Sequence, residues 1–144
     1  MHKTTFEVIP YNSTAWINAV KLREKILREP LASSFTRQEL EEEEHHIQIA
    51  GFSAGTIIAT AVLVAEGDKM KMQRVVVAET LRGLNIGSAM MTFCEKLAAD
   101  QKCKLIYCHA RHSAVNFYLK NGYEGVGDYF EEDGIPHLKM SKKL

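Results

Sequence analysis

The chain has 144 residues, of which 46% are hydrophobic and 25% are charged, as expected for a soluble globular protein that buries a core without metals or disulfides. Its 18 basic and 18 acidic residues give a formal net charge of zero, so no overall field indicates a nucleic-acid or membrane partner. Three cysteines form no disulfide framework, and the absence of an apolar leader or span predicts a cytoplasmic protein.

We expect a single domain over residues 1–144, because no repeat, linker or break in composition divides the chain. The alternation in Thr5–Val8 predicts a half-buried strand. A helix is expected from a cap at residues 12–14 to Pro30, with Trp16 and Leu27 on its apolar face. Thr36–Glu39 has the form of a capping box, so a second short helix should begin there and continue into the acidic residues 41–44.

The middle of the chain is rich in β-forming residues. His46–Phe52 and Thr56–Val64 predict two strands joined by a hairpin turn. Lys69–Val77 predicts a third strand, and its continuous apolar end, Val75–Val77, indicates burial on both faces.

The C-terminal half alternates between helical and strand patterns. Apolar residues from Ile86 to Leu97 recur at helical spacing, and the chain then favours a strand, a helix and two last strands. This order predicts an α/β fold, a mixed central sheet of about six to seven strands with helices on both faces. The later expected elements are a strand at Lys104–Ala110, a helix at Ser113–Asn121 closed by a left-handed Gly122, and strands at Tyr123–Gly127 and Leu138–Ser141 around the polar segment Glu131–Gly134.

A glycine-containing turn stands between the third strand and the helix that follows it. Gly83 and Gly87 allow close backbone approach, and the first turn of a helix offers unpaired N–H groups to an anion. The segment therefore has the outline of a pyrophosphate cradle. It lacks the ending of a P-loop and the spacing of a dinucleotide fingerprint. A plain strand-to-helix turn remains the alternative.

Two segments carry a family resemblance. Val75–Val77 followed by Arg82-Gly83-Leu84-Asn85-Ile86-Gly87-Ser88-Ala89 resembles the acetyl-CoA motif of the GNAT N-acetyltransferase superfamily, Gln/Arg-x-x-Gly-x-Gly/Ala. Ala114–Tyr123 resembles its second motif, Ala-x-x-Phe-Tyr-x-x-x-Gly-Phe/Tyr, and Phe130–His137 is similar to the tail of the small bacterial ElaA-like branch. Asn85 departs from the usual glycine, and His109 stands where many relatives have asparagine.

The resemblance implies the GNAT acyl-CoA N-acyltransferase fold, with acetyl-CoA as co-substrate and a primary amine of a small molecule or peptide as acceptor. The backbone of the third strand would pair with the pantetheine arm, and the turn would hold the pyrophosphate. Asparagine tolerates the left-handed conformation better than other non-glycine residues, so we expect the cradle to survive. The implied donor-binding residues are Val75, Val76, Val77, Arg82, Gly83, Leu84, Asn85, Ile86, Gly87, Ser88, Asn116 and Tyr118.

The resemblance also assigns chemistry to Tyr118, as the general acid that protonates the departing thiolate. A core tyrosine with a hydrogen-bonded hydroxyl is the alternative. Glu44 and His45 are candidates for the general base, although a solvated acidic helix face explains most of that run. Two further pairs are weaker candidates for the acceptor site: Arg23 and Arg28 for an anionic group, and His109 and His137 as lining residues.

A metal-binding protein, an acyl-CoA sensor and a purely structural protein are the alternatives to an enzyme. Cys103, Cys108, His109 and His112 lack paired metal-ligand spacing, so no metal is expected, and the cysteines read as buried apolar residues. A non-catalytic acyl-CoA sensor stays open because of Asn85, whereas a purely structural protein would require two ordered motifs to arise by chance. Zero net charge and the resemblance both favour a homodimer.

Overall fold

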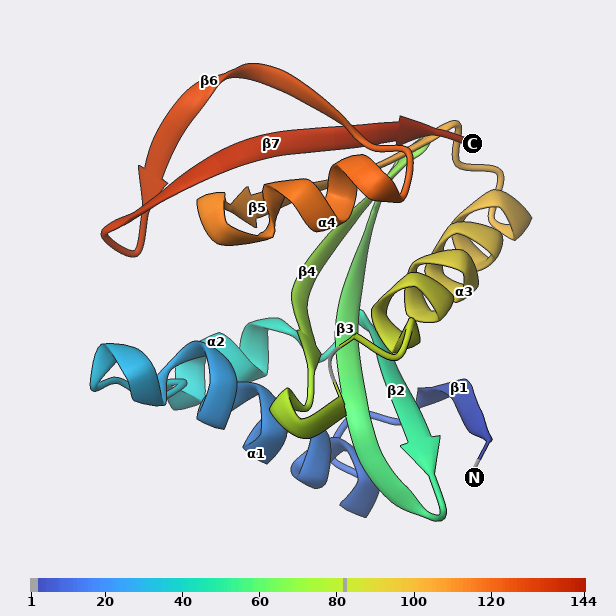
Figure 1. The fold of residues 1–144 in the computed structure, drawn as a ribbon. Coiled ribbons are helices and arrows are strands. Elements are labelled where there is room, and N and C mark those ends of the chain that lie inside the picture. Colours follow the sequence, from blue (N-terminus) through green and yellow to red (C-terminus); the bar gives the residue numbers. More distant parts are fainter. Residues whose placement is uncertain (1–2, 82) are drawn as a thin grey trace. The chain divides into compact units, whose positions relative to one another are not determined.

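The computed structural model describes residues 3–81 and 83–144 (Figure 1). The chain divides into two compact units. The first runs to Leu63 and includes Arg74–Phe93, and the second consists of Val64–Gln73 and Cys94–Leu144. Strands β3 and β4 and helix α3 each contribute to both units.

The described residues contain seven strands in one mixed sheet of order β1-β2-β3-β4-β5-β7-β6. The pairs β1–β2, β2–β3, β5–β7 and β6–β7 are antiparallel, whereas β4 and β5 pair in parallel after the crossover through α3. The elements are β1 (Thr4–Ile9), α1 (Thr14–Leu27), η1 (Glu29–Leu31), α2 (Arg37–Glu42), β2 (Ile47–Ser53), β3 (Thr56–Glu66), β4 (Lys69–Val77), η2 (Glu79–Leu81), α3 (Ile86–Asp100), β5 (Leu105–Arg111), η3 (His112–Ala114), α4 (Val115–Lys120), β6 (Glu124–Glu132) and β7 (Ile135–Lys143).

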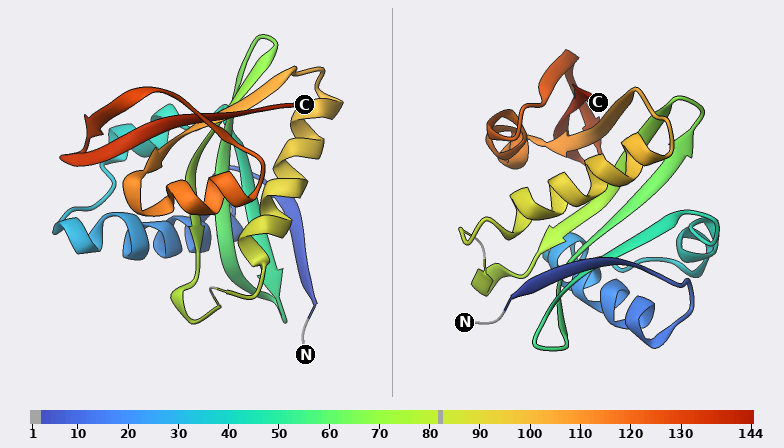
Figure 2. Two further views of the ribbon diagram at one scale, coloured as in Figure 1. Left: turned by 45° about the horizontal axis from the view of Figure 1, so that its top comes forward. Right: turned by 90° about the vertical axis from the view of Figure 1, so that its right-hand side faces the viewer.

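The first unit is built around the β1–β2–β3 meander and helix α1 (Figure 2). Ser13 caps α1 by accepting a hydrogen bond from the Trp16 N–H group at 3.1 Å. Trp16 and Ala19 are one turn apart and pack with Ala50 of β2 in a buried cluster. Thr36 and its partner three residues later form a complete capping box at the start of α2.

The second unit places helix α4 against β5 and extends the sheet with a long β6–β7 hairpin (Figure 1). Register between β5 and β7 sets Cys108 opposite Met140 and His109 opposite Lys139. Because successive side chains of a strand point to opposite faces, Cys108 and Met140 share the buried face, whereas His109 and Lys139 share the other.

The fold class is confirmed, and most predicted elements occur within a few residues of their expected bounds. The expected continuation of α2 through residue 44 is wrong, since the helix ends at Glu42. Both last strands are longer than predicted, because β6 is almost entirely exposed and so carries no apolar alternation. The run Val75–Val77 is also less buried than predicted, since only Val76 is in the core.

Candidate functional site

The turn before α3 adopts a conformation suited to binding an anion. Gly83 and Asn85 have φ angles of 87° and 62°, both in the left-handed region. The Asn85 carbonyl accepts the first helical hydrogen bond, from the N–H group of Ala89 at 3.0 Å. The three N–H groups between them, at residues 86–88, therefore have no partner inside the helix. A left-handed residue followed by a helical one forms a concave nest of N–H groups, a shape that binds phosphate oxygens.

The predicted donor-binding residues of this region all lie in the first unit. Gly83, Leu84 and Asn85 are exposed, Gly87 and Ser88 are half-buried, and the Ile86 side chain is buried beneath the turn. A Cβ atom added at Gly83 would meet no described atom within 4 Å, so the space above the turn is open. Arg82, predicted to add a cation there, lies outside the described residues.

Strand β4 approaches this turn through a local irregularity. Arg74 has a φ of 54°, which is unusual for a non-glycine residue inside a strand. The pairing of β4 with β5 covers Lys69–Met72 and Leu105–Cys108. Beyond Arg74 the strand continues through Val75–Val77, where Val76 alone is buried.

Tyr118 lies in the second unit, on α4, and its side chain is 5% exposed. The hydroxyl contacts the thiol of Cys108 on β5 by a hydrogen bond. Burial, followed by the nearby Cys108 and Cys94 thiols, raises the pKa of Tyr118 well above its ordinary value. The phenol therefore stays protonated at neutral pH. Asn116, one of the predicted donor-binding residues, is exposed on the first turn of the same helix.

A second network fixes the C-terminal end of α4. Tyr123 donates a hydrogen bond of 2.9 Å to Glu95, whose other carboxylate oxygen accepts one of 3.0 Å from Lys142. The Tyr118 and Tyr123 rings meet edge to face at 5.4 Å. Gly122 between them has a φ of 88°, the predicted left-handed residue after the helix. Tyr118 is thus held by packing on both sides.

The two residues predicted as general base are on the surface of the first unit. The His45 side chain is 92% exposed and its Nε2 atom is 3.8 Å from Oε2 of Glu44. Both follow the end of α2 in a turn. The structure places them near Glu43, which is buried and forms an ion pair of 2.5 Å with Arg23.

Three arginines surround the ring of Phe35 in the first unit, a cluster that the sequence did not predict. The guanidinium carbons of Arg23, Arg28 and Arg74 lie 5.0, 4.2 and 4.9 Å from the ring centroid. Arg28 forms a two-pronged ion pair with Glu39 at 3.0 and 2.6 Å, which lowers the pKa of Glu39 to about 2. Arg23 and Arg28 are therefore buried partners of carboxylates rather than surface residues.

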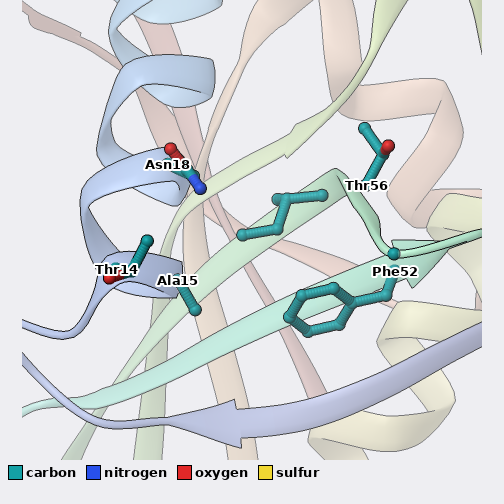
Figure 3. A pocket seen from close by; sticks show the side chains of 7 residues that line it. Thr14, Ala15, Asn18, Phe52 and Thr56 are labelled. Carbon is teal, nitrogen blue, oxygen red and sulfur yellow. The ribbon is translucent and has the colours of Figure 1, made fainter.

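A cleft of about 450 Å³ opens between the start of α1 and the β2–β3 hairpin (Figure 3). Thr14 and Asn18 project from the helix, and the Phe52 ring lies on the strand side. Its described lining residues are all apolar or uncharged polar residues. The remaining lining residues are Ala15, Gly55, Thr56 and Ile57.

Among residues 3–81 and 83–144, no group of three or more histidine, cysteine or acidic side chains is arranged to hold a metal ion. Cys94, Cys103 and Cys108 are free and buried, as predicted for the latter two. No helix of the described chain is long and apolar enough to cross a membrane.

Comparison with known proteins identifies the family. A family model for the acetyltransferase (GNAT) domain matches residues 18–144. Protein ElaA of Escherichia coli is 31% identical over 100 residues, which cover 67% of this chain and 65% of ElaA, slightly less than two thirds of that protein. An uncharacterized N-acetyltransferase of Bacillus subtilis, YitI, is 25% identical over 132 residues, covering 86% of this chain and 89% of YitI.

Solved structures show the same fold. The crystal structure of Escherichia coli ElaA matches with a TM-score of 0.80 and 23% identity, covering 99% of both chains. An aminoglycoside 6'-N-acetyltransferase complexed with coenzyme A matches with a TM-score of 0.79 and 16% identity, covering 96% of both chains. With the family match over most of the chain, these likenesses show that the protein belongs to the GNAT acetyltransferase family, in its ElaA-like branch.

Proposed function

We propose that this GNAT protein transfers an acetyl group from acetyl-CoA to a primary amine by direct attack. The observation that carries the proposal is the nest at Gly83–Ser88, where a left-handed Asn85 opens α3 and leaves three N–H groups without a helical partner in an exposed turn. A pyrophosphate is the part of acetyl-CoA that such N–H groups and the helix dipole would bind.

The remaining donor contacts are proposed from the family motif. The backbone of Val75–Val77 would pair with the pantetheine arm, and Arg82 would add a cation beside the pyrophosphate. Asn116 and Tyr118 are proposed near the thioester end. The chemistry that acetyl-CoA supplies is an activated acyl group on a thiol leaving group.

Tyr118 is proposed to donate its hydroxyl proton toward the departing sulfur. Its raised pKa supports this role in one respect, because the hydroxyl remains protonated over the whole neutral range. It also means that the tyrosine is a weak acid, so its hydroxyl hydrogen-bonds to sulfur first and gives up the proton only as negative charge develops there. Glu44 and His45 remain proposed base candidates, acting through water from their exposed turn.

The donor site is tested by calorimetric titration of acetyl-CoA and of CoA into the purified protein. Gly87→Glu introduces a bulky anion into the first turn of α3 and should abolish binding while the protein stays folded by circular dichroism. Thr92→Glu adds the same charge to an exposed position of the same helix, beyond its free N–H groups, and should bind as the wild type does. Equal weakening by both substitutions would contradict the nest.

Turnover is tested by thiol release from acetyl-CoA with water alone and with a panel of primary amines. Tyr118→Phe keeps the ring packing and removes the hydroxyl, so kcat should fall about 10²-fold or more while acetyl-CoA affinity is retained. Binding without any thiol release in the wild type would instead support the acyl-CoA sensor.

A further inference from the structure

Two histidines share one carboxylate on the second unit. Nδ1 of His109, on β5, lies 3.1 Å from Oε1 of Glu132 at the end of β6. Nε2 of His137, on β7, lies 3.6 Å from the other oxygen of the same carboxylate. The Phe130 ring is close to both imidazoles, with its centroid 5.1 Å from that of His109 and 6.0 Å from that of His137. All four residues belong to one compact unit.

The hydrogen bonds select the protonated nitrogen of His109. A carboxylate can only accept, so the Nδ1 atom of His109 must carry the hydrogen that it donates to Glu132. In the neutral ring the lone pair is then on Nε2, the atom directed away from Glu132. The His109 side chain is 28% exposed, so part of its ring is open to solvent. An imidazole oriented in this way by a carboxylate is suited to accept a proton.

His137 serves a different purpose, because it is only 4% exposed. Its Nδ1 atom donates to the carbonyl of Ile135 at 2.7 Å, which fixes the ring and directs Nε2 toward Glu132. His137 is thus a buried and fixed neighbour of Glu132, and His109 is the accessible member of the group.

Strand β5 places His109 on the face opposite Tyr118. The Tyr118 hydroxyl contacts Cys108, and His109 is the next residue along the strand, so its side chain points the other way. One strand therefore has a proton donor against one face and a proton acceptor on the other. The titratable or charged groups on the His109 face are Tyr107 and Arg111 of β5, Lys69 and Lys71 of β4, Glu124 and Glu132 of β6, and His137, Lys139 and Lys143 of β7, together with Glu66, which accepts the Tyr107 hydrogen bond.

We propose that His109 is the general base of the reaction and that Glu132 is its positioning residue, an inference that rests on the proposed acetyl transfer. Nε2 of His109 removes one proton from the acceptor ammonium and passes it to solvent. The neutral amine forms the C–N bond and the C–S bond breaks. Tyr118 gives its proton to the departing sulfur, and the second proton, released from nitrogen as the amide forms, passes through solvent and restores the Tyr118 hydroxyl.

The test measures thiol release from acetyl-CoA across pH 6–10, with water alone and with spermidine or lysine amide as acceptor. His109→Ala should lower kcat/KM by about 10²- to 10⁴-fold and remove the acid limb of the profile. Added imidazole should restore part of the rate. His112→Ala, which removes an exposed histidine three residues away, should leave rate and profile unchanged.

Glu132→Gln distinguishes positioning from a structural role. Glutamine can still accept the Nδ1 hydrogen but lacks the carboxylate charge that orients the ring, so kcat should fall roughly tenfold while the KM for acetyl-CoA is unchanged. In the His109→Ala background, Glu132→Gln should lower kcat/KM no further, because the two residues act as one unit. A full additional loss in the double variant would overturn the assignment.

The outcomes separate this inference from the proposed function. If the wild type binds and turns over acetyl-CoA and His109→Ala keeps its rate and profile, the inference fails alone. If His45→Ala removes the acid limb instead, the base is His45. If the wild type shows no binding and no thiol release, the proposed function itself fails. Multiple-bond ¹⁵N–¹H spectra give an independent reading, since a hydrogen on Nε2 of neutral His109 would contradict the geometry.

Discussion

Asn85→Ala tests whether the anion-binding turn is fixed by the fold or forms only with the donor. Asn85 occupies a left-handed conformation with a φ of 62°. Alanine in that region is disfavoured by contact between its Cβ atom and the following carbonyl, at a cost of about 1 kcal/mol, which asparagine partly avoids. Whether this cost lowers the stability of the protein or its affinity for acetyl-CoA depends on whether the free protein already holds the turn in this conformation.

If the free protein holds the conformation, the whole cost falls on stability. The free energy of unfolding then decreases by about 1 kcal/mol, equivalent to a Tm lower by roughly 3 °C for a domain of this size. Acetyl-CoA affinity changes by less than twofold, because both bound and free forms carry the same strain. If the turn forms only on binding, stability is unchanged and affinity falls about fivefold, since 1.4 kcal/mol corresponds to a factor of ten.

The assay combines chemical denaturation with calorimetric titration of acetyl-CoA on wild type, Asn85→Ala and Asn85→Gly. We expect the stability loss without the affinity loss for alanine, because the Asn85 carbonyl is already engaged in the first helical hydrogen bond. Glycine adopts φ > 0 freely and should bind the donor at least as well as asparagine. A variant with alanine that loses neither stability nor affinity would refute the left-handed turn.

Two other predictions concern the half-buried Glu39 carboxylate and two buried thiols. Because its pKa is lowered to about 2 mainly by the hydrogen bond from Arg28, the Glu39 carboxylate contributes stability above pH 4.5 that is lost as pH falls toward 2. Glu39→Gln should therefore lower the free energy of unfolding by about 2 kcal/mol at pH 7, a value discounted for partial exposure, and by almost nothing near pH 2. The control Glu42→Gln, at an exposed position, should leave the free energy of unfolding in urea unchanged at both pH values. Burial raises the pKa of the Cys94 and Cys108 thiols to about 12, so a thiol reagent at pH 8 should modify them only in denaturant; rapid modification of the native protein would contradict their burial.

Local signals in the sequence were enough to predict much of the fold. The capping box at Thr36 and the strand Lys69–Val77 depend on neighbouring residues alone, and both occur as predicted. The turn before α3 was predictable for the same reason, since its glycines and Asn85 lie within one short segment. Strand β6 was underestimated because its exposed residues lack the alternation that marks a half-buried strand.

The cluster around Phe35 was beyond such reasoning. Arg74 and Glu43, 31 residues apart in sequence, meet at 3.4 Å only through the tertiary fold. The same holds for His109 and Glu132, 23 residues apart. The sequence around a single charged residue does not indicate which distant residue pairs with it, whereas all members of a short motif lie within one segment of the chain. Roles that depend on such pairs therefore need coordinates before they can be assigned.

Strand β5 connects these two kinds of information. The second motif marked Tyr118 from local sequence, but the residue beneath it, Cys108, fixes which face of β5 the tyrosine occupies. The period of two then requires His109 to point the opposite way, toward Glu132. A slip of one residue in the pairing of β5 with β7 would exchange the two faces and bury the imidazole beneath α4. The separation of the proposed proton donor from the proposed proton acceptor on this unit is thus a consequence of strand register, and both proposed roles depend on the β5–β7 pairing.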